Sequence, residues 1–158
     1  MNDRLIARMK TLGAIPTPFS TYVYYHGEKM RYYGADRLNH MFALRSFLDA
    51  GIRATQASDY PPGEFIPMMA LQSEVTRTDR QGNVWGPQQR ITVEEAIRVG
   101  TLNGAYASYE ENLKGSIEAG KLADLVVLGR DPLKENPSTL VTIPVERTMA
   151  GGRWTFES

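Results

Sequence analysis

Cysteine is absent from this sequence, and histidine is nearly so. Without cysteine the chain forms no disulfide and no thiolate metal site, which is typical of a protein in a reducing compartment. Its two histidines, His26 and His40, do not stand in the H-x-H or H-E-x-x-H spacing of histidine metal sites. The chain therefore does not supply a multi-histidine metal centre by itself.

Long apolar runs and an excess of one charge are also missing. No apolar stretch approaches the roughly 18 to 20 residues of a membrane helix, and the N-terminus lacks the apolar segment of a signal peptide. The 18 Lys and Arg residues balance 18 Asp and Glu residues, which argues against a basic surface for nucleic acid. We expect a cytoplasmic protein that binds neither nucleic acid nor membrane.

Helix and strand signals alternate along the first two thirds of the chain. Apolar spacing and capping residues predict helices over 3–12, 36–48 and 66–77, and a capping box starts another helix at Thr92. A strand is predicted over 52–57, whereas 14–19 contains two prolines and is an edge strand at most. This βα rhythm predicts an α/β fold whose parallel sheet is either open or closed into a barrel.

The C-terminal third has a different sequence pattern, with turn and strand signals in place of helix signals. A short β run at 124–128 lies between turns, and the glycine pair after Ala150 predicts a hairpin joining 145–149 to 153–156. We therefore place a boundary near residues 112–114, which gives two domains, 1–113 and 114–158.

Asp59 is the best candidate for chemistry. It follows the predicted strand 52–57, and a carboxylate at the carboxyl end of such a strand can bind a metal or take a proton from an attacking water. The sequence equally allows a turn-forming role, because Pro61-Pro62-Gly63 comes next. Residues 80–89 are expected to form a surface loop.

The tyrosine-rich residues 20–35 are long enough for a binding loop. We take Tyr25 and His26 within it, and Tyr60 beside Asp59, as candidate substrate-binding residues. A solvated role for His26 stays open, and His40 is expected to pack within the predicted helix 36–48.

A phosphate-binding loop is excluded. Residues 115–121 match its G-x-x-x-x-G-K pattern, but Leu122 stands where Ser or Thr would hold magnesium. A β run follows the lysine, so no helix N-terminus is available for a phosphate.

Several blocks of the sequence resemble the amidohydrolase superfamily, and within it the group called amidohydrolase family 3. The most specific is Gly-Ser-Ile-Glu-Ala-Gly-Lys-Leu-Ala-Asp-Leu from Gly115, which resembles the C-terminal signature of the superfamily together with 145–154. The other blocks follow in the order of the family: 12–18, 45–53, 57–59, 84–96 and 101–107.

The resemblance implies a metal-dependent hydrolase of carbon–nitrogen bonds other than peptide bonds. The family folds as a (β/α)8 TIM-type barrel with a small β-sandwich and uses divalent metal, commonly zinc. Asp59 matches the aspartate at the end of barrel strand eight, which binds metal and acts on the attacking water. The H-x-H pair and the other ligands precede the matched region, so the resemblance implies a partial barrel fragment of units seven and eight, trailing helices and C-terminal sandwich strands.

Two readings of this partial barrel follow. In the first reading the chain is a piece of an amidohydrolase, such as a truncated product or half of a split enzyme, and is inactive until the missing barrel strands are supplied. In the second reading it is a self-standing module. In the second case a homo-oligomer covers the open strand edges and binds a small molecule or metal without catalysis. The expected substrate in the complete enzyme is a small amide, formamide or urea-like compound, contacted in part by the loop 19–34.

Overall fold

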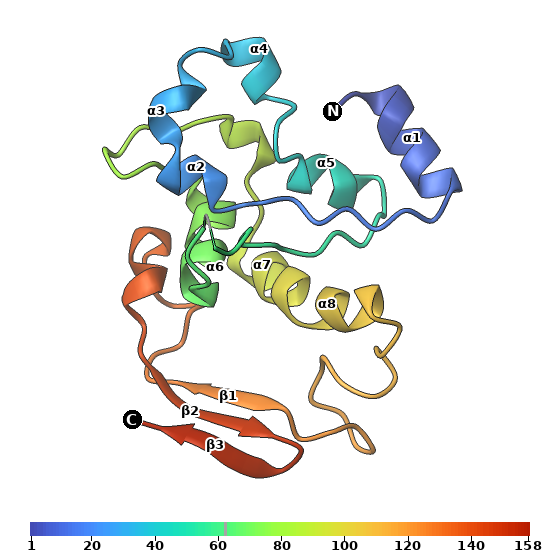
Figure 1. Ribbon diagram of the computed structural model, residues 1–158, viewed down its shortest axis with the longest axis vertical. Helices are drawn as coiled ribbons and strands as arrows, with labels where there is room; N and C mark the ends of the chain where they lie inside the picture. The colour runs from blue at the N-terminus through green and yellow to red at the C-terminus, as the bar shows by residue number, and fades with distance from the viewer. Residues whose placement is uncertain (62) are drawn as a thin grey trace.

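The first helix begins where the capping pattern predicts it. In the computed structural model, which describes residues 1–61 and 63–158, α1 spans Asp3–Thr11 (Figure 1). Asn2 Oδ1 accepts a hydrogen bond from the backbone N–H of Leu5 at 3.0 Å. Gly13 follows the helix with a φ of +64°, a conformation that glycine adopts at low cost.

Two extended segments run parallel after this helix. Phe19 and Ala57 form a parallel bridge, and the N–H groups of Thr55 and Ala57 donate to the carbonyls of Pro16 and Pro18 at 3.0 and 3.2 Å. The expected strand 52–57 is wrong to this extent: the segment is extended but makes an isolated bridge instead of a ladder. Proline has no N–H to donate, so the hydrogen bonds between the segments run in one direction.

The predicted loop 20–35 is helical in large part. It contains α2 (Tyr22–Tyr25) and α3 (Gly27–Met30), and α4 (Ala35–Leu38) begins at its end. The predicted helix 36–48 is also wrong, because it is broken into α4 and α5 (Leu44–Asp49).

A buried arginine explains the break between α4 and α5. Phe42 lies between them with a φ of +49°, in the left-handed region that an α-helix does not pass through. The Arg77 guanidinium donates to the carbonyls of Met41 at 3.2 Å and Phe42 at 3.5 Å. The carbonyls of Met41 and Phe42 therefore accept hydrogen bonds from a residue that is distant in sequence.

Three further helices follow: α6 (Pro67–Thr76), α7 (Val93–Gly100) and α8 (Leu102–Ala107). Of these, α6 and α7 contribute side chains to the main core. The predicted helix 66–77 is confirmed by α6. A short 3₁₀ helix, η1 (Pro87–Gln89), lies in the expected surface loop, and a second one, η2 (Pro137–Thr142), packs on α6. Leu140 and Ile143 join the core there, with Ala54, Phe47 and Val99.

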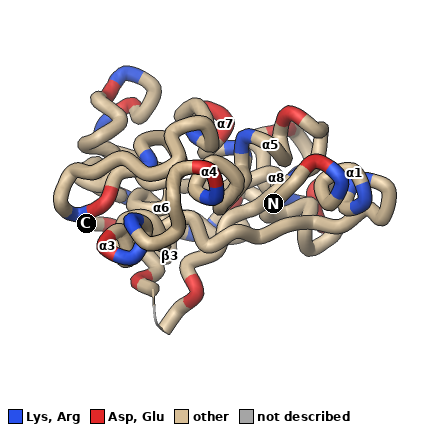
Figure 2. Tube along the Cα trace, turned by 90° about the horizontal axis from the view of Figure 1, so that it is seen from above, with Lys and Arg blue, Asp and Glu red and all other residues tan. Residues whose placement is uncertain are grey.

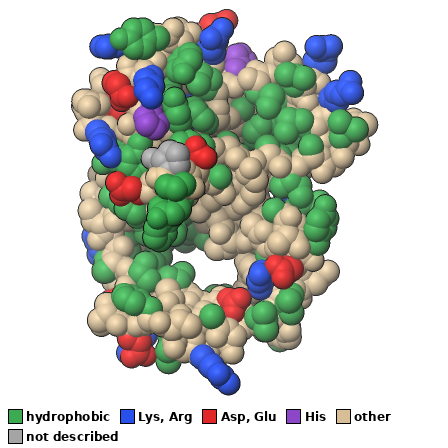
Figure 3. Space-filling model, viewed as in Figure 1, with side chains coloured by type: hydrophobic (Ala, Val, Ile, Leu, Met, Phe, Trp, Pro, Cys, Tyr) green, Lys and Arg blue, Asp and Glu red, His purple; other side chains and the backbone are tan. Residues whose placement is uncertain are grey.

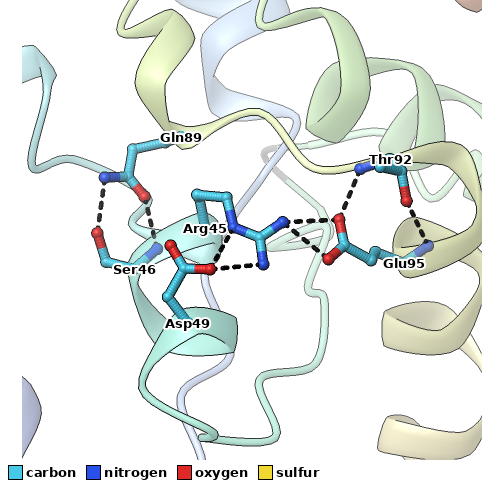
Figure 4. A network of polar contacts seen from close by, with 6 residues as sticks. All are labelled: Arg45, Ser46, Asp49, Gln89, Thr92 and Glu95. Carbon is cyan, nitrogen blue, oxygen red and sulfur yellow. Dashed lines mark hydrogen bonds and ion pairs between the residues drawn. The ribbon is translucent and has the colours of Figure 1, made fainter.

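Polar contacts tie α5 to α7 (Figure 4). The capping box predicted at Thr92 is present, with Thr92 Oγ1 accepting from the Glu95 N–H and the Glu95 carboxylate accepting from the Thr92 N–H. Arg45 then pairs with Glu95 at 2.7 Å and with Asp49 at 2.8 Å. The same carboxylate thus closes the start of α7 and holds α5 beside it.

The C-terminal residues form the predicted small β unit. Its strands β1 (Leu125–Leu128), β2 (Val145–Ala150) and β3 (Arg153–Glu157) make an antiparallel sheet in that order. The sheet lies apart from α7 and α8, and Figure 3 shows the gap between them, an open cavity of about 690 Å³. The division into 1–113 and 114–158 stays a prediction.

Acidic and basic residues are interspersed along the trace (Figure 2). In the described part of the chain, no helix has the length and apolar character needed to cross a membrane. The molecule combines helices, one pair of parallel extended segments and a three-stranded antiparallel sheet.

Candidate functional site

The carboxyl ends of the two parallel segments lie at one edge. The bridge between Phe19 and Ala57 fixes this alignment. The aromatic segment, which we define as residues 19–34, begins at that edge, and Asp59 follows two residues beyond the bridge on the other segment. The topology therefore brings the predicted binding segment and the predicted metal ligand to the same end of the pair.

Asp59 lies in a tight turn. Its φ is +54°, and its carbonyl accepts a hydrogen bond from the Gly63 N–H at 3.1 Å. A Cβ at Gly63 would overlap the carbonyl oxygen of Ser58 and come within 2.8 Å of the Phe19 ring. The turn thus packs back against both segments and leaves the Asp59 side chain exposed.

The Asp59 carboxylate is available for a ligand. Within residues 1–61 and 63–158, it takes part in no hydrogen bond or ion pair. Turn formation and an available carboxylate are compatible, since the turn uses the backbone of Asp59.

His26 belongs to an aromatic cluster. Its ring lies 4.5 Å from the ring of Tyr22, centroid to centroid, and Tyr22 also contacts Phe42 at 5.4 Å and Phe19 at 5.5 Å. Burial raises the pKa of Tyr22, with Tyr33 as the next contribution. The half-buried His26 is therefore packed rather than simply solvated.

Tyr25 lies in a second aromatic contact on the same segment. Its ring meets Tyr24 edge-on at 5.2 Å, and the Arg80 guanidinium lies 4.9 Å from its centroid. Burial, and after it the Glu64 carboxylate, raises the pKa of Tyr25. Arg80 and Glu64 are neighbours that the sequence reading missed, because both come from other segments.

Tyr60 and His40 lie at the surface. The Tyr60 side chain is 64% exposed and packs edge-on against the exposed Phe65 at 5.0 Å. The expectation that His40 packs inside a helix is wrong: it is exposed, between α4 and α5, and its carbonyl accepts from the N-terminal amine at 2.7 Å. In the part of the chain that the structure describes, ring contacts and hydrogen bonds join neither His26, Tyr25 nor Tyr60 to Asp59.

These residues fit part of a metal centre. A catalytic zinc site commonly has three protein ligands. Among the described residues, His, Asp and Glu side chains nowhere gather in a group of three that suits a metal. Asp59 offers one carboxylate, so further ligands would have to come from outside this chain.

Comparison with known proteins shows one consistent relationship. A family model described as the amidohydrolase family matches residues 1–156. The chain is 38% identical over 133 residues to an N-substituted formamide deformylase from Arthrobacter pascens, covering 83% of this chain and 24% of that protein. It is 30% identical over 127 residues to the putative amidohydrolase YtcJ of Bacillus subtilis, covering 78% and 24%. The chain thus spans about a quarter of the length of these curated relatives.

Comparison with solved structures shows a similar fold in part of longer proteins. An uncharacterized metal-dependent hydrolase from Pyrococcus horikoshii superposes with a TM-score of 0.74 at 19% identity, covering 87% of this chain and 28% of that one. Guanine deaminase from E. coli superposes with a TM-score of 0.70 at 18% identity, covering all of this chain and 37% of that one. At these identities the likeness concerns the fold alone.

Proposed function

Because this chain belongs to the amidohydrolase family, we propose that it contributes Asp59 and one wall of the substrate pocket to a metal-dependent hydrolase of non-peptide carbon–nitrogen bonds. The observation that carries the proposal is the exposed Asp59 carboxylate at the shared end of two parallel segments. Functional residues of α/β barrels gather at this end of the strands.

Asp59 has two roles in this proposal. A divalent metal, zinc in our proposal, activates water and polarises the scissile carbonyl when it is bound. Asp59 is one of the ligands, accepts a proton from the attacking water and returns it to the leaving nitrogen as the carbon–nitrogen bond breaks. The water oxygen ends on the carbonyl carbon, so the products are a carboxylic acid and an amine.

The aromatic segment forms the pocket wall. His26 and Tyr25 are held in place by ring contacts, and Tyr60 stands exposed next to Asp59 in the chain. Aromatic surfaces with a few polar groups suit a small organic substrate. The relative from Arthrobacter is named for N-substituted formamides, and we propose compounds of this amide class as substrates.

The chain alone should be inactive, since its described residues bring together no complete metal centre. The test is a chimera of the Arthrobacter deformylase in which the 133 matching residues are replaced by this chain. We expect the chimera to hydrolyse an N-substituted formamide, and Asp59→Asn to lower kcat at least about a hundredfold.

The matched control is Asp36→Asn, which removes an exposed carboxylate on α4 and should leave the rate unchanged. Equal rates for Asp59→Asn and the control would overturn the assignment. Metal-dependent hydrolysis by the unfused chain, abolished by Asp59→Asn, would overturn the claim that outside ligands are needed.

A further inference from the structure

A short hairpin after α6 packs against the aromatic segment. We define residues 78–84 as the Asp79 hairpin, because Thr78 and Val84 form an antiparallel bridge at its two ends. The Asp79 N–H donates to the Asn83 carbonyl at 2.9 Å, which closes the hairpin further. Figure 1 shows this part of the chain beside α3.

The Asp79 carboxylate holds the hairpin together. Asp79 is 4% exposed, and its carboxylate accepts hydrogen bonds from the Gln81 and Asn83 N–H groups at 2.9 Å each and from the Trp85 indole N–H at 2.7 Å. Burial raises the pKa of Asp79, but the hydrogen bonds from Trp85, Asn83 and Gln81 outweigh it and lower that pKa. The ionised carboxylate with these donors therefore fixes the conformation of the hairpin.

Asp79 also contacts the first residue of α3. A Cβ at Gly27 would overlap Asp79 Cβ and come within 2.7 Å of Asp79 Cγ, so the two residues fit together only because Gly27 has no side chain. Gly27 is buried and directly follows His26. This close approach of backbone and side chain determines where α3 begins relative to the hairpin.

Arg80 makes the second contact with the aromatic segment. Its guanidinium lies 4.9 Å from the Tyr25 ring centroid and 5.5 Å from the Tyr24 ring centroid. Two consecutive hairpin residues thus contact both sides of one short stretch: Arg80 contacts Tyr25, and Asp79 contacts the residue after His26.

The aromatic segment needs such contacts. Its helices α2 and α3 have four residues each, and helices of this length have little stability of their own. We propose that Asp79 and Arg80 are positioning residues, which hold Tyr25 and His26 in the orientation in which they meet the substrate. This inference rests on the proposed function, because that function makes Tyr25 and His26 part of the pocket wall.

Hydrogen exchange of the unfused chain tests the positioning role without a substrate. In Asp79→Asn an NH₂ group replaces one carboxylate oxygen and cannot accept a hydrogen bond. The amide protons of Tyr25 and His26, both hydrogen-bonded across α2, should then exchange at least about tenfold faster. Exchange in α7 should change less. Equal acceleration in α7, or no acceleration at Tyr25 and His26, would overturn the proposal.

Arg80→Met gives a second measurement if Asp79→Asn does not fold, because Arg80 is exposed. Loss of its ring contacts should accelerate exchange at Tyr25 about two- to fivefold. The matched control is Arg53→Met, since the exposed Arg53 guanidinium lies 4.4 Å from the ring centroid of Tyr106 in α8. This control should leave exchange at Tyr25 unchanged. Equal exchange at Tyr25 in Arg80→Met and the parent chain would overturn the role of Arg80.

Kinetics of the deformylase chimera relate the positioning role to substrate binding. Asp79→Asn should raise KM for an N-substituted formamide about tenfold and change kcat by less than about twofold, whereas Asp59→Asn lowers kcat. Faster exchange with an unchanged KM would overturn the link to the substrate. An inactive chimera would overturn the proposed function and not the positioning role, which the exchange measurement decides by itself.

Discussion

At the scale of a single residue, Glu74 determines how the stability of the chain should depend on pH. Its pKa rises from 4.5 to about 8 on folding because of burial. Between these two values the folded chain holds a proton that the unfolded chain has released. The free energy of unfolding should therefore fall by up to about 1.4 kcal/mol per pH unit from pH 4.5 to pH 8.

Urea unfolding across this pH range measures the effect. The stabilising contribution of the protonated group is fully present below pH 4.5 and lost as the pH rises through about 8. Glu74→Gln should flatten this part of the profile and be more stable than the parent at pH 8. A parallel fall in both proteins would show that other groups are responsible.

Gly63 is a second residue whose replacement should change stability, because there is no space for a side chain at this position. A Cβ there would overlap the Ser58 carbonyl oxygen and crowd the Phe19 ring. Gly63→Ala should lower the free energy of unfolding by about 1–3 kcal/mol, as overpacking does elsewhere. Gly104→Ala in α8 is the matched control, because the added Cβ would lie at an ordinary contact distance of 3.7 Å from Thr55 Oγ1. Thermal unfolding should show the control unchanged or more stable by up to about 1 kcal/mol.

Candidate site residues could be proposed from the sequence only where position along the chain was informative. Asp59 became a candidate because it follows the predicted strand 52–57. Glu74 did not, although it stands three residues after the buried Leu71 and four after the buried Ala70, on the core face of α6. A charged residue in that register was the available signal. Its lack of hydrogen-bond partners is a property of the tertiary structure, which local spacing does not reveal.

At the scale of elements, the capping box of α7 should contribute measurable stability. Thr92→Ala removes the hydroxyl that accepts from the Glu95 N–H at 3.2 Å. We expect a loss of about 1 kcal/mol in the free energy of unfolding, measured in urea. Thr92→Ser keeps the hydroxyl and should restore most of it. Equal losses for Ala and Ser would mean that the Thr92 methyl group, not the cap, is important.

The tie between α5 and α7 is best measured by a double-mutant cycle. Hydrogen bonding to Glu95 raises the pKa of Arg45. Partial burial acts to raise the pKa of Glu95, but hydrogen bonds from the Thr92 N–H and from Arg45 outweigh it and lower that pKa. Both side chains are about a third exposed. Arg45→Met and Glu95→Gln should therefore couple by about 0.5–1 kcal/mol. A coupling near zero would show that the pair adds nothing to the helix contact.

The elements that depend on interactions between neighbours in sequence were predictable from the sequence. The Asn2 cap, the Thr92 capping box and the Gly151-Gly152 hairpin all involve neighbours in sequence, and α1, α7 and the β2–β3 pair are confirmed. The break between α4 and α5 depends on Arg77, which is distant in sequence. Tertiary contacts of this kind override helix periodicity.

At the scale of the whole molecule, the parallel segments 14–19 and 52–57 are paired to each other but to no further strand in the described residues. The match to about a quarter of each curated relative agrees with this open arrangement. The family was predictable from sequence blocks. The exact metal ligands were not, because one carboxylate does not define a metal centre.

Metal content measured by native mass spectrometry tests the central claim most directly. The samples are the unfused chain, the deformylase chimera and the chimera carrying Asp59→Asn, each supplied with zinc. We predict no stoichiometric metal on the unfused chain, a fixed ratio on the chimera, and a reduced ratio with Asp59→Asn. A fixed ratio on the unfused chain, or one on the chimera that Asp59→Asn leaves unchanged, would contradict the account.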